Sequence, residues 1–246
     1  MQITVSDSAR DREWHRATEL ADVEGWRLVA RKDADWSEPV VVVTRTCLAV
    51  CRDGRTWRWH DGMLHALRAS GARHPLVRLG RIKPGDRVLD ATLGLGTDAR
   101  FISEWTGETV VGLERSPVIA RLTREGLEGV KANVKVVCGD ALELMAAMPA
   151  RAFDVVIADP MFPPRPEDSP KGTTLDAIRG VAIDAPLSMN WKVQACRVAN
   201  RVVVVRDMRG SGFLEALGAE SIFERRGRLA RYGVWPADSA ESKGQS

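Results

Sequence analysis

The strongest constraint on the fold is the stretch of residues 87–98, Arg-Val-Leu-Asp-Ala-Thr-Leu-Gly-Leu-Gly-Thr-Asp. Its apolar start ends at Asp90, two glycines follow at Gly94 and Gly96, and a helix-like apolar spacing begins near Thr97. This order predicts a buried parallel strand, a glycine loop and a helix N-terminus. Glycine lets a backbone approach a ligand closely, and helix-start N–H groups attract polar or negative groups. We therefore expect a ligand at this loop, and a tight turn that binds nothing is the alternative.

After this stretch, short apolar runs alternate with helix-like segments. Strands are expected at residues 109–113, 134–138, 153–158 and 201–206, and helices at 117–127, 142–148, within 174–198 and at 213–217. Two closing strands, at 221–224 and 228–235, are expected to join at a turn. Such alternation predicts an α/β fold, a Rossmann-like, mostly parallel sheet with right-handed crossovers and an antiparallel C-terminal hairpin.

The first 60 residues are expected to form a small α+β subdomain. Their pattern predicts one helix between residues 6 and 23, strands at 26–30 and 40–43, and a hairpin around Asp53-Gly54. Trp57 and Trp59 share one face, for which core packing is the default interpretation and a stacking platform the alternative. Residues 61–80 are expected to form a helical connector, 81–236 the main domain, and 237–246 a disordered polar tail.

Composition narrows the class of protein without identifying a substrate. The net charge of +3 permits nucleic-acid binding but does not require it. The four cysteines have no metal-binding spacing, so no metal is expected. No apolar run approaches the roughly 20 residues of a membrane span, and the polar N-terminus carries no visible secretory signal. We therefore expect a cytoplasmic protein without a membrane partner.

Polar residues stand where each predicted parallel strand ends, which is where open α/β sheets bind ligands. Glu114 follows the second strand and is placed to accept hydrogen bonds from both ribose hydroxyls of an adenosine ligand; a solvated loop carboxylate is the alternative. Asp140 follows the third strand, where its carboxylate can read the adenine amine while the Ala141 N–H reads a ring nitrogen. Asp140 is also a good helix N-cap, and both roles are compatible.

The fourth strand ends in Asp159-Pro160-Met161-Phe162, which is close to the Asp/Asn-Pro-Pro-aromatic signature of methyltransferases acting on planar exocyclic amines. Such an amine is a poor nucleophile because its lone pair is delocalised. The Asp159 carboxylate and the Pro160 carbonyl are placed to accept its N–H bonds, and Phe162 to stack on the base. Methyl transfer then needs position more than acid or base catalysis. An ordinary strand end with a proline-rich turn is the alternative.

Several motifs together resemble one family. Asp-Ala-Thr-Leu-Gly-Leu-Gly-Thr-Asp at 90–98, Glu-Arg-Ser-Pro at 114–117 and Asp-Pro-Met-Phe-Pro at 159–163 look like the RsmJ (YhiQ)-type methyltransferases. These transfer a methyl group from S-adenosylmethionine to the N2 amine of a guanine in small-subunit ribosomal RNA. The connector at 60–63 and the segments 201–206 and 232–235 are similar too. The chain has Thr97-Asp98 where characterised members commonly have Arg-Asp, and Asp140-Ala141 where they commonly have two serines.

The resemblance implies S-adenosyl-L-methionine as the cofactor and RNA as the partner. The implied cofactor-binding residues are Asp90, Gly94, Gly96, Thr97, Asp98, Glu114, Arg115, Asp140, Ala141 and Asp159. Asp159, Pro160 and Phe162 are the implied catalytic residues. Arg165, Lys171 and Arg179 lie near the expected active-site edge, where they could meet phosphates, and solvated surface charge is the alternative. One alternative is methylation of a small molecule or a protein amide. A second is a Rossmann oxidoreductase that uses a nicotinamide cofactor, since residues 94–99 also fit G-x-G-x-x-A. A third is a non-catalytic RNA-binding protein.

Overall fold

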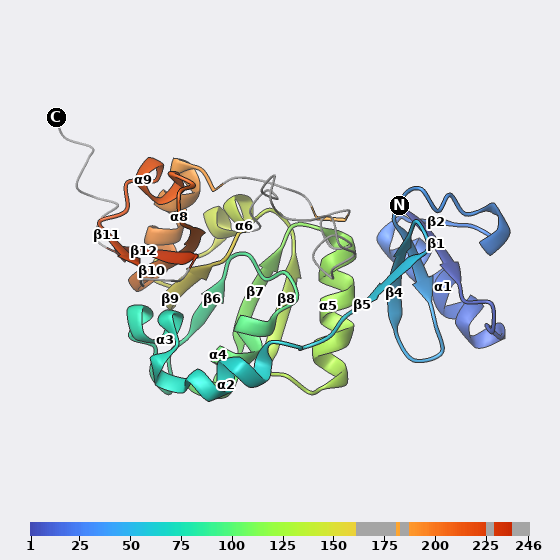
Figure 1. Ribbon diagram of the computed structural model, residues 1–246, viewed down its shortest axis with the longest axis horizontal. Coiled ribbons are helices and arrows are strands. Elements are labelled where there is room, and N and C mark those ends of the chain that lie inside the picture. The colour runs from blue at the N-terminus through green and yellow to red at the C-terminus, as the bar shows by residue number, and fades with distance from the viewer. Residues whose placement is uncertain (161–180, 183–186, 225–228, 238–246) are drawn as a thin grey trace.

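The chain forms two β-sheets, each with its own helices, in a computed structural model that describes residues 1–160, 181–182, 187–224 and 229–237 (Figure 1). The first sheet has five strands in the order β2-β1-β3-β4-β5. The second has seven strands in the order β11-β12-β10-β9-β6-β7-β8. Among the described residues, no helix is long and apolar enough to cross a membrane.

The N-terminal sheet is built around the run of four buried valines that forms β3. Its elements are β1 Gln2–Val5, α1 Asp11–Glu24, β2 Arg27–Leu28, a 3₁₀ turn Arg31–Asp33, β3 Val40–Val43, β4 Leu48–Arg52 and β5 Arg55–Arg58. β1 pairs in parallel with β2 and β3, whereas β3, β4 and β5 are antiparallel. The hairpin at Asp53-Gly54 is confirmed, with both residues at positive φ. The strand β1 was not expected, because it is short and its pairing partners lie more than twenty residues away in the chain.

The connector holds α2 Leu64–Ser70, a 3₁₀ turn Gly71–Arg73 and α3 Pro75–Gly80. The main domain then alternates as expected. Its elements are β6 Val88–Asp90, α4 Thr97–Thr106, β7 Val110–Glu114, α5 Pro117–Gly129, β8 Val134–Cys138, α6 Ala141–Ala147, β9 Phe153–Ala158, α8 Met189–Val198, β10 Ala199–Met208, α9 Phe213–Ala216, β11 Ser221–Glu224 and β12 Ala230–Pro236.

The pairing of the large sheet confirms the Rossmann-like fold. Strands β8, β7, β6, β9 and β10 are parallel, and β12 runs antiparallel to both β10 and β11, which gives the expected edge hairpin. β6 lies between β7 and β9, so the strand order reverses there. Ligands of open α/β sheets bind at such a switch point, beyond the carboxyl ends of the strands. The glycine loop follows β6 and Asp159 follows β9, the strands on the two sides of this switch point.

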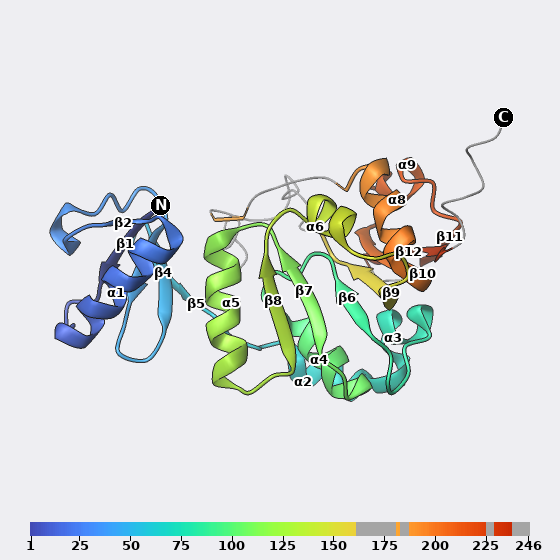
Figure 2. The same cartoon turned by 180° about the vertical axis from the view of Figure 1, so that it is seen from behind.

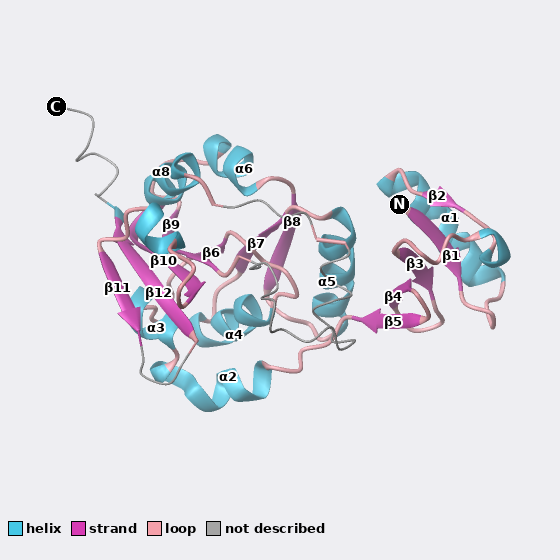
Figure 3. Cartoon of the chain, turned by 45° about the horizontal axis from the view of Figure 1, so that its top comes forward, coloured by secondary structure: helices cyan, strands magenta, loops and turns pink. Residues whose placement is uncertain are grey.

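Helices cover both faces of this sheet (Figure 2 and Figure 3). Side chains of α2, α3 and α4 pack with the strands in one buried cluster, and those of α6, α8 and α9 in another. A third cluster joins the two sheets, because Val118, Ile119 and Leu122 of α5 pack with buried residues of the N-terminal sheet. Trp57 is buried in that cluster and Trp59 packs against it, as core packing requires. The divisions at residues 60, 80 and 236 stay a prediction.

Candidate active site

The glycine loop between β6 and α4 adopts a backbone conformation that favours glycine. Gly94 and Gly96 have φ of +52° and +71°, where a Cβ strains the backbone. A Cβ on Gly96 would also lie 3.0 Å from the Leu127 Cδ1 and 3.2 Å from the Thr123 Cγ2 on α5. The backbone therefore lies directly against α5, and α4 begins at the next residue, Thr97.

Glu114, at the end of β7, fastens this loop. Its Oε2 accepts the Gly94 N–H at 2.9 Å, and its Oε1 accepts the Ser116 N–H at 2.8 Å. Burial raises the pKa of this carboxyl, although the backbone hydrogen bonds oppose the shift. Glu114 is therefore not a solvated loop carboxylate. A carboxylate has about four lone-pair positions, more than these bonds use, so Glu114 can also accept from a hydroxyl group of a ligand.

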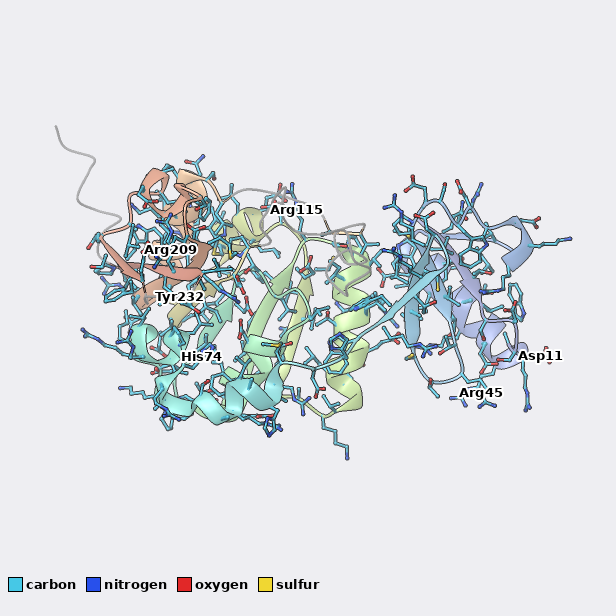
Figure 4. The ribbon with its side chains drawn as sticks, in the orientation of Figure 1. Asp11, Arg45, His74, Arg115, Arg209 and Tyr232 are labelled. Carbon is cyan, nitrogen blue, oxygen red and sulfur yellow. The ribbon has the colours of Figure 1, made fainter. Side chains whose placement is uncertain are left out.

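Asp140 lies one strand further along the sheet edge, and both of its carboxylate oxygens have structural partners. Its Oδ1 accepts the Leu142 N–H at 2.8 Å, which makes it the N-cap of α6. Its Oδ2 lies 3.2 Å from Nε of Arg115, which is labelled in Figure 4. A ligand amine at Asp140 would therefore share the Oδ2 with Arg115.

Asp159, directly after β9, is tied to both the glycine loop and the neighbouring strand. Its backbone N–H donates to the Thr92 hydroxyl at 2.6 Å, and its Oδ2 accepts from the Arg206 guanidinium at 2.7 Å. The Asp159 side chain is 32% exposed, so it lines the surface of the site. Burial, together with the charge of Asp98, raises the pKa of Asp159 to about 6, although Arg206 lowers it. The Asp159 carboxyl therefore loses its proton, and becomes a full hydrogen-bond acceptor, as the pH rises through about 6.

Two further carboxyl groups, those of Asp90 and Asp98, lie at the two ends of the loop. Asp90 is only 4% exposed and accepts the Thr92 N–H at 3.0 Å. Burial raises the pKa of Asp90 to about 8, and the charges of Asp98, Asp159 and Glu114 add to the effect. Burial also raises the pKa of Asp98, against the opposing charge of Arg206. Carboxyl groups with raised pKa values in one place favour a ligand that brings positive charge.

Arg206, near the end of β10, is a site residue that was not expected from the sequence. Burial opposes its charge, but Asp159, Tyr232 and Asp98 raise the pKa of its guanidinium. Tyr232 is its direct partner in the β10–β12 ladder. The rule that ligands bind at the carboxyl ends of parallel strands, applied to the fifth strand, would have found Arg206.

His74 and Tyr232, both labelled in Figure 4, lie near Arg206. Burial raises the pKa of Tyr232, and Asp159 and Asp98 add to the shift while Arg206 opposes it. Burial, then the charge of Arg206, lowers the pKa of His74 to about 4, so its ring is neutral at neutral pH. The His74 ring packs edge-on against Phe101 with centroids 5.3 Å apart. His74 therefore packs as a neutral aromatic residue near the arginine.

The structure brings most of the expected site residues to one sheet edge. Asp90, Gly94, Gly96, Thr97, Asp98, Glu114 and Asp159 surround the switch point, and Arg115, Asp140 and Ala141 follow along the next strands. Pro160 directly follows Asp159. Phe162, Arg165, Lys171 and Arg179 lie outside the described residues.

Known proteins resemble this chain in sequence and in fold. A family profile described as "Putative SAM-dependent methyltransferase" matches residues 59–237. YpiP of Bacillus subtilis is 34% identical over 176 residues, which cover 67% of each chain. Ribosomal RNA small subunit methyltransferase J of Pseudomonas paraeruginosa is 32% identical over 180 residues, 68% of this chain and 67% of that protein. The crystal structure of the SAM-dependent methyltransferase NGO1261 from Neisseria gonorrhoeae covers 100% of both chains with a TM-score of 0.69 at 18% identity, which shows a shared fold.

Proposed function

The chain belongs to the family of SAM-dependent methyltransferases that includes ribosomal RNA small subunit methyltransferase J, and we propose that it methylates the exocyclic N2 amine of a guanine in small-subunit ribosomal RNA. Membership of this family makes it an S-adenosylmethionine-dependent enzyme and removes the nicotinamide oxidoreductase as an alternative. The nature of the methyl acceptor is the part that we propose.

The residues at the switch point fit S-adenosylmethionine. A Cβ on Gly94 would meet only the Thr92 carbonyl, at 3.9 Å, so the missing side chain leaves room for a ligand against the backbone there. The carboxyl groups of Asp90 and Asp98 have raised pKa values, which suits a ligand with a sulfonium and an ammonium group. We propose that these residues and Thr97 hold its amino-acid part, Glu114 and Arg115 its ribose, and Asp140 and Ala141 its adenine. When bound, this cofactor supplies an electrophilic methyl group.

The observation that carries the proposed chemistry is the position of Asp159. Its backbone N–H is bonded to Thr92 of the glycine loop, so its carboxylate lies beside the cofactor residues. We propose that this carboxylate and the Pro160 carbonyl accept the two N–H bonds of an aromatic amine and turn its lone pair toward the methyl group. Arg206 keeps Asp159 in its accepting, ionised form. The gain comes from position and from an acceptor matched to charge that develops on the amine.

The proposal that the amine belongs to RNA rests on the relatives. The proteins named ribosomal RNA small subunit methyltransferase J are 31–32% identical to this chain over about two thirds of its length. We propose that Phe162 stacks on the target base and that Arg165, Lys171 and Arg179 contact phosphates. A ribosomal RNA substrate would also place the protein in the cytoplasm.

The second candidate function uses the same Asp159-Pro160 motif on a small molecule or a protein amide. It is favoured by the net charge of only +3, which gives the chain no strongly basic character. Transfer of a tritiated methyl group from the cofactor to deproteinised ribosomal RNA, against transfer to a metabolite extract or to total protein, separates the two.

The test of the mechanism is the Asp159→Ala variant with the cofactor saturating. Because the change removes an acceptor placed for the transition state, single-turnover transfer to ribosomal RNA should slow by orders of magnitude. Asp154→Ala is the matched control, since Asp154 accepts the Arg87 N–H at the opposite end of β9. Circular dichroism checks both folds. A folded Asp159→Ala enzyme that works at nearly the parental rate would refute the mechanism.

A further inference from the structure

Trp59 connects the N-terminal sheet to the backbone of the cofactor loop. It is the first residue after β5, and its indole N–H donates to the carbonyl of Leu95 at 2.9 Å. Leu95 stands between the two loop glycines, Gly94 and Gly96. A side chain from the end of the N-terminal sheet therefore contacts the centre of the loop.

Trp59 packs on α5 at a position where the helix has a glycine. A Cβ on Gly126 would lie only 2.0 Å from the Cδ2 of Trp59, so the ring lies directly on the helix backbone. The Leu95 side chain packs against the same apolar cluster as Trp59, the one that joins α5 to the N-terminal sheet. Figure 1 and Figure 2 both show α5 beside β4 and β5. The indole is thus held by packing in a position where its N–H reaches the loop.

Trp59 makes one of the three bonds that hold Gly94 and Leu95 from outside the loop. Glu114 accepts the Gly94 N–H, and the Thr123 hydroxyl donates to the Gly94 carbonyl at 2.7 Å. These two partners belong to the Rossmann-like sheet and its helix α5. The third bond, to Leu95, comes from Trp59. At Gly94 and Leu95 these bonds come from side chains of other elements, so the order of this part of the loop depends on such partners.

We infer that Trp59 is a positioning residue for the cofactor loop, and that the N-terminal sheet serves cofactor binding by anchoring Trp59 on α5. The inference rests on the assignment of the cofactor to this loop. Ordering a loop before its ligand arrives reduces the conformational entropy that is lost on binding. Loss of the Trp59 bond should therefore weaken cofactor binding even though Trp59 itself contacts only the outer side of the loop.

The first test compares Trp59→Phe with Trp105→Phe in the full-length protein. Both changes keep an aromatic ring and remove one indole hydrogen bond to a backbone carbonyl, because Trp105 donates to Ile82 at 3.0 Å, away from the loop. Calorimetry with S-adenosylhomocysteine should show a dissociation constant about tenfold higher for Trp59→Phe and unchanged for Trp105→Phe. Thermal unfolding reports the loss of stability that both variants share.

The second test uses two glycines of the same helix. Gly126→Ala places a methyl group where the Trp59 ring lies, whereas a Cβ on Gly129 meets nothing within 4 Å. Only Gly126→Ala should weaken S-adenosylhomocysteine binding. If Trp59→Phe and Gly126→Ala both bind within twofold of the unaltered protein, Trp59 has a structural role alone and the inference is wrong. If the unaltered protein itself fails to bind, the cofactor site is wrong instead.

Discussion

The ion pair between Arg206 and Asp159 should set the lower limit of the pH range in which the enzyme is active. Burial and the charge of Asp98 raise the pKa of Asp159, Arg206 lowers it, and the balance stands at about 6. The Arg206→Gln change removes the opposing charge and keeps a polar side chain. The pKa of Asp159 should therefore rise further, and a larger fraction of it should be protonated at neutral pH.

The size of this effect follows from the geometry. Opposite charges 2.7 Å apart attract by about 6 kcal/mol at an effective dielectric constant of about 20, and by about 1.5 kcal/mol in water. The side chains of Arg206 and Asp159 are 41% and 32% exposed, so solvent screening favours the lower end of this range. A loss of about 1.5–3 kcal/mol corresponds to a rise of about one to two pKa units. Asp159 would then titrate at about 7–8.

The assay is the pH dependence of single-turnover methyl transfer between about pH 5 and pH 8.5, with the cofactor saturating. Asp159 must be ionised to accept the amine, so the rate should fall as the pH drops through its pKa. In Arg206→Gln this acid limb should move about one to two units upward, while the rate at the alkaline end recovers. Arg206→Lys keeps the charge and should move the limb much less.

Another arginine of β10 provides a second control. Arg201→Gln removes an arginine from the same strand that pairs with Asp86, and it should leave the acid limb in place. An acid limb at the same pH in Arg206→Gln and in the unaltered enzyme would refute the electrostatic role of Arg206.

Three further predictions follow from other residues. Glu114→Ala should weaken S-adenosylhomocysteine binding by about 1–3 kcal/mol, because buried hydroxyls and the Gly94 N–H lose their acceptor; calorimetry that shows unchanged affinity in a folded variant would exclude the ribose assignment. Asp90 has a folded-state pKa of about 8, far above its ordinary value, so its contribution to stability is present below about pH 4 and is lost as the pH rises through 8. Denaturant unfolding of the cofactor-free protein should therefore show a smaller loss of stability between about pH 5 and pH 9 in Asp90→Asn, and an equal loss would contradict the burial of that charge. If the substrate is RNA, the affinity should fall as salt rises, and alanine at Arg165 and Lys171 should each reduce the slope of log affinity against log salt by about one; a salt-independent affinity would favour a small-molecule substrate.

The sequence was most informative where local chemistry determines structure. Positions 94 and 96 have positive φ, which favours glycine, and the hairpin at Asp53-Gly54 needs residues that tolerate such a backbone, so both features could be predicted. The alternation after residue 87 was sufficient to predict the Rossmann-like sheet and its closing hairpin, which the strand pairing confirms. The strand β1 was missed, because its pairing with β2 and β3 is fixed by partners more than twenty residues away in the chain.

The roles of individual site residues depended more on tertiary contacts. Nothing local to Arg206 shows that it pairs with Asp159, 47 residues earlier. The bond from Trp59 to Leu95 spans 36 residues and depends on the missing side chain at Gly126. Glu114 was predicted from its strand end, but its bond to the loop N–H needed the three-dimensional arrangement. Sequence patterns thus located the edge of the sheet, and the structure shows how the residues there are connected.

The most direct test of the central claim is the methylation state of small-subunit ribosomal RNA in cells that lack this protein. We expect mass spectrometry of that RNA to show one N2-methylguanine lost, and the purified protein with tritiated S-adenosylmethionine to restore it while Asp159→Ala does not. Small-subunit RNA with identical modifications in the presence and absence of the protein, and no transfer of label to it in vitro, would contradict the claim.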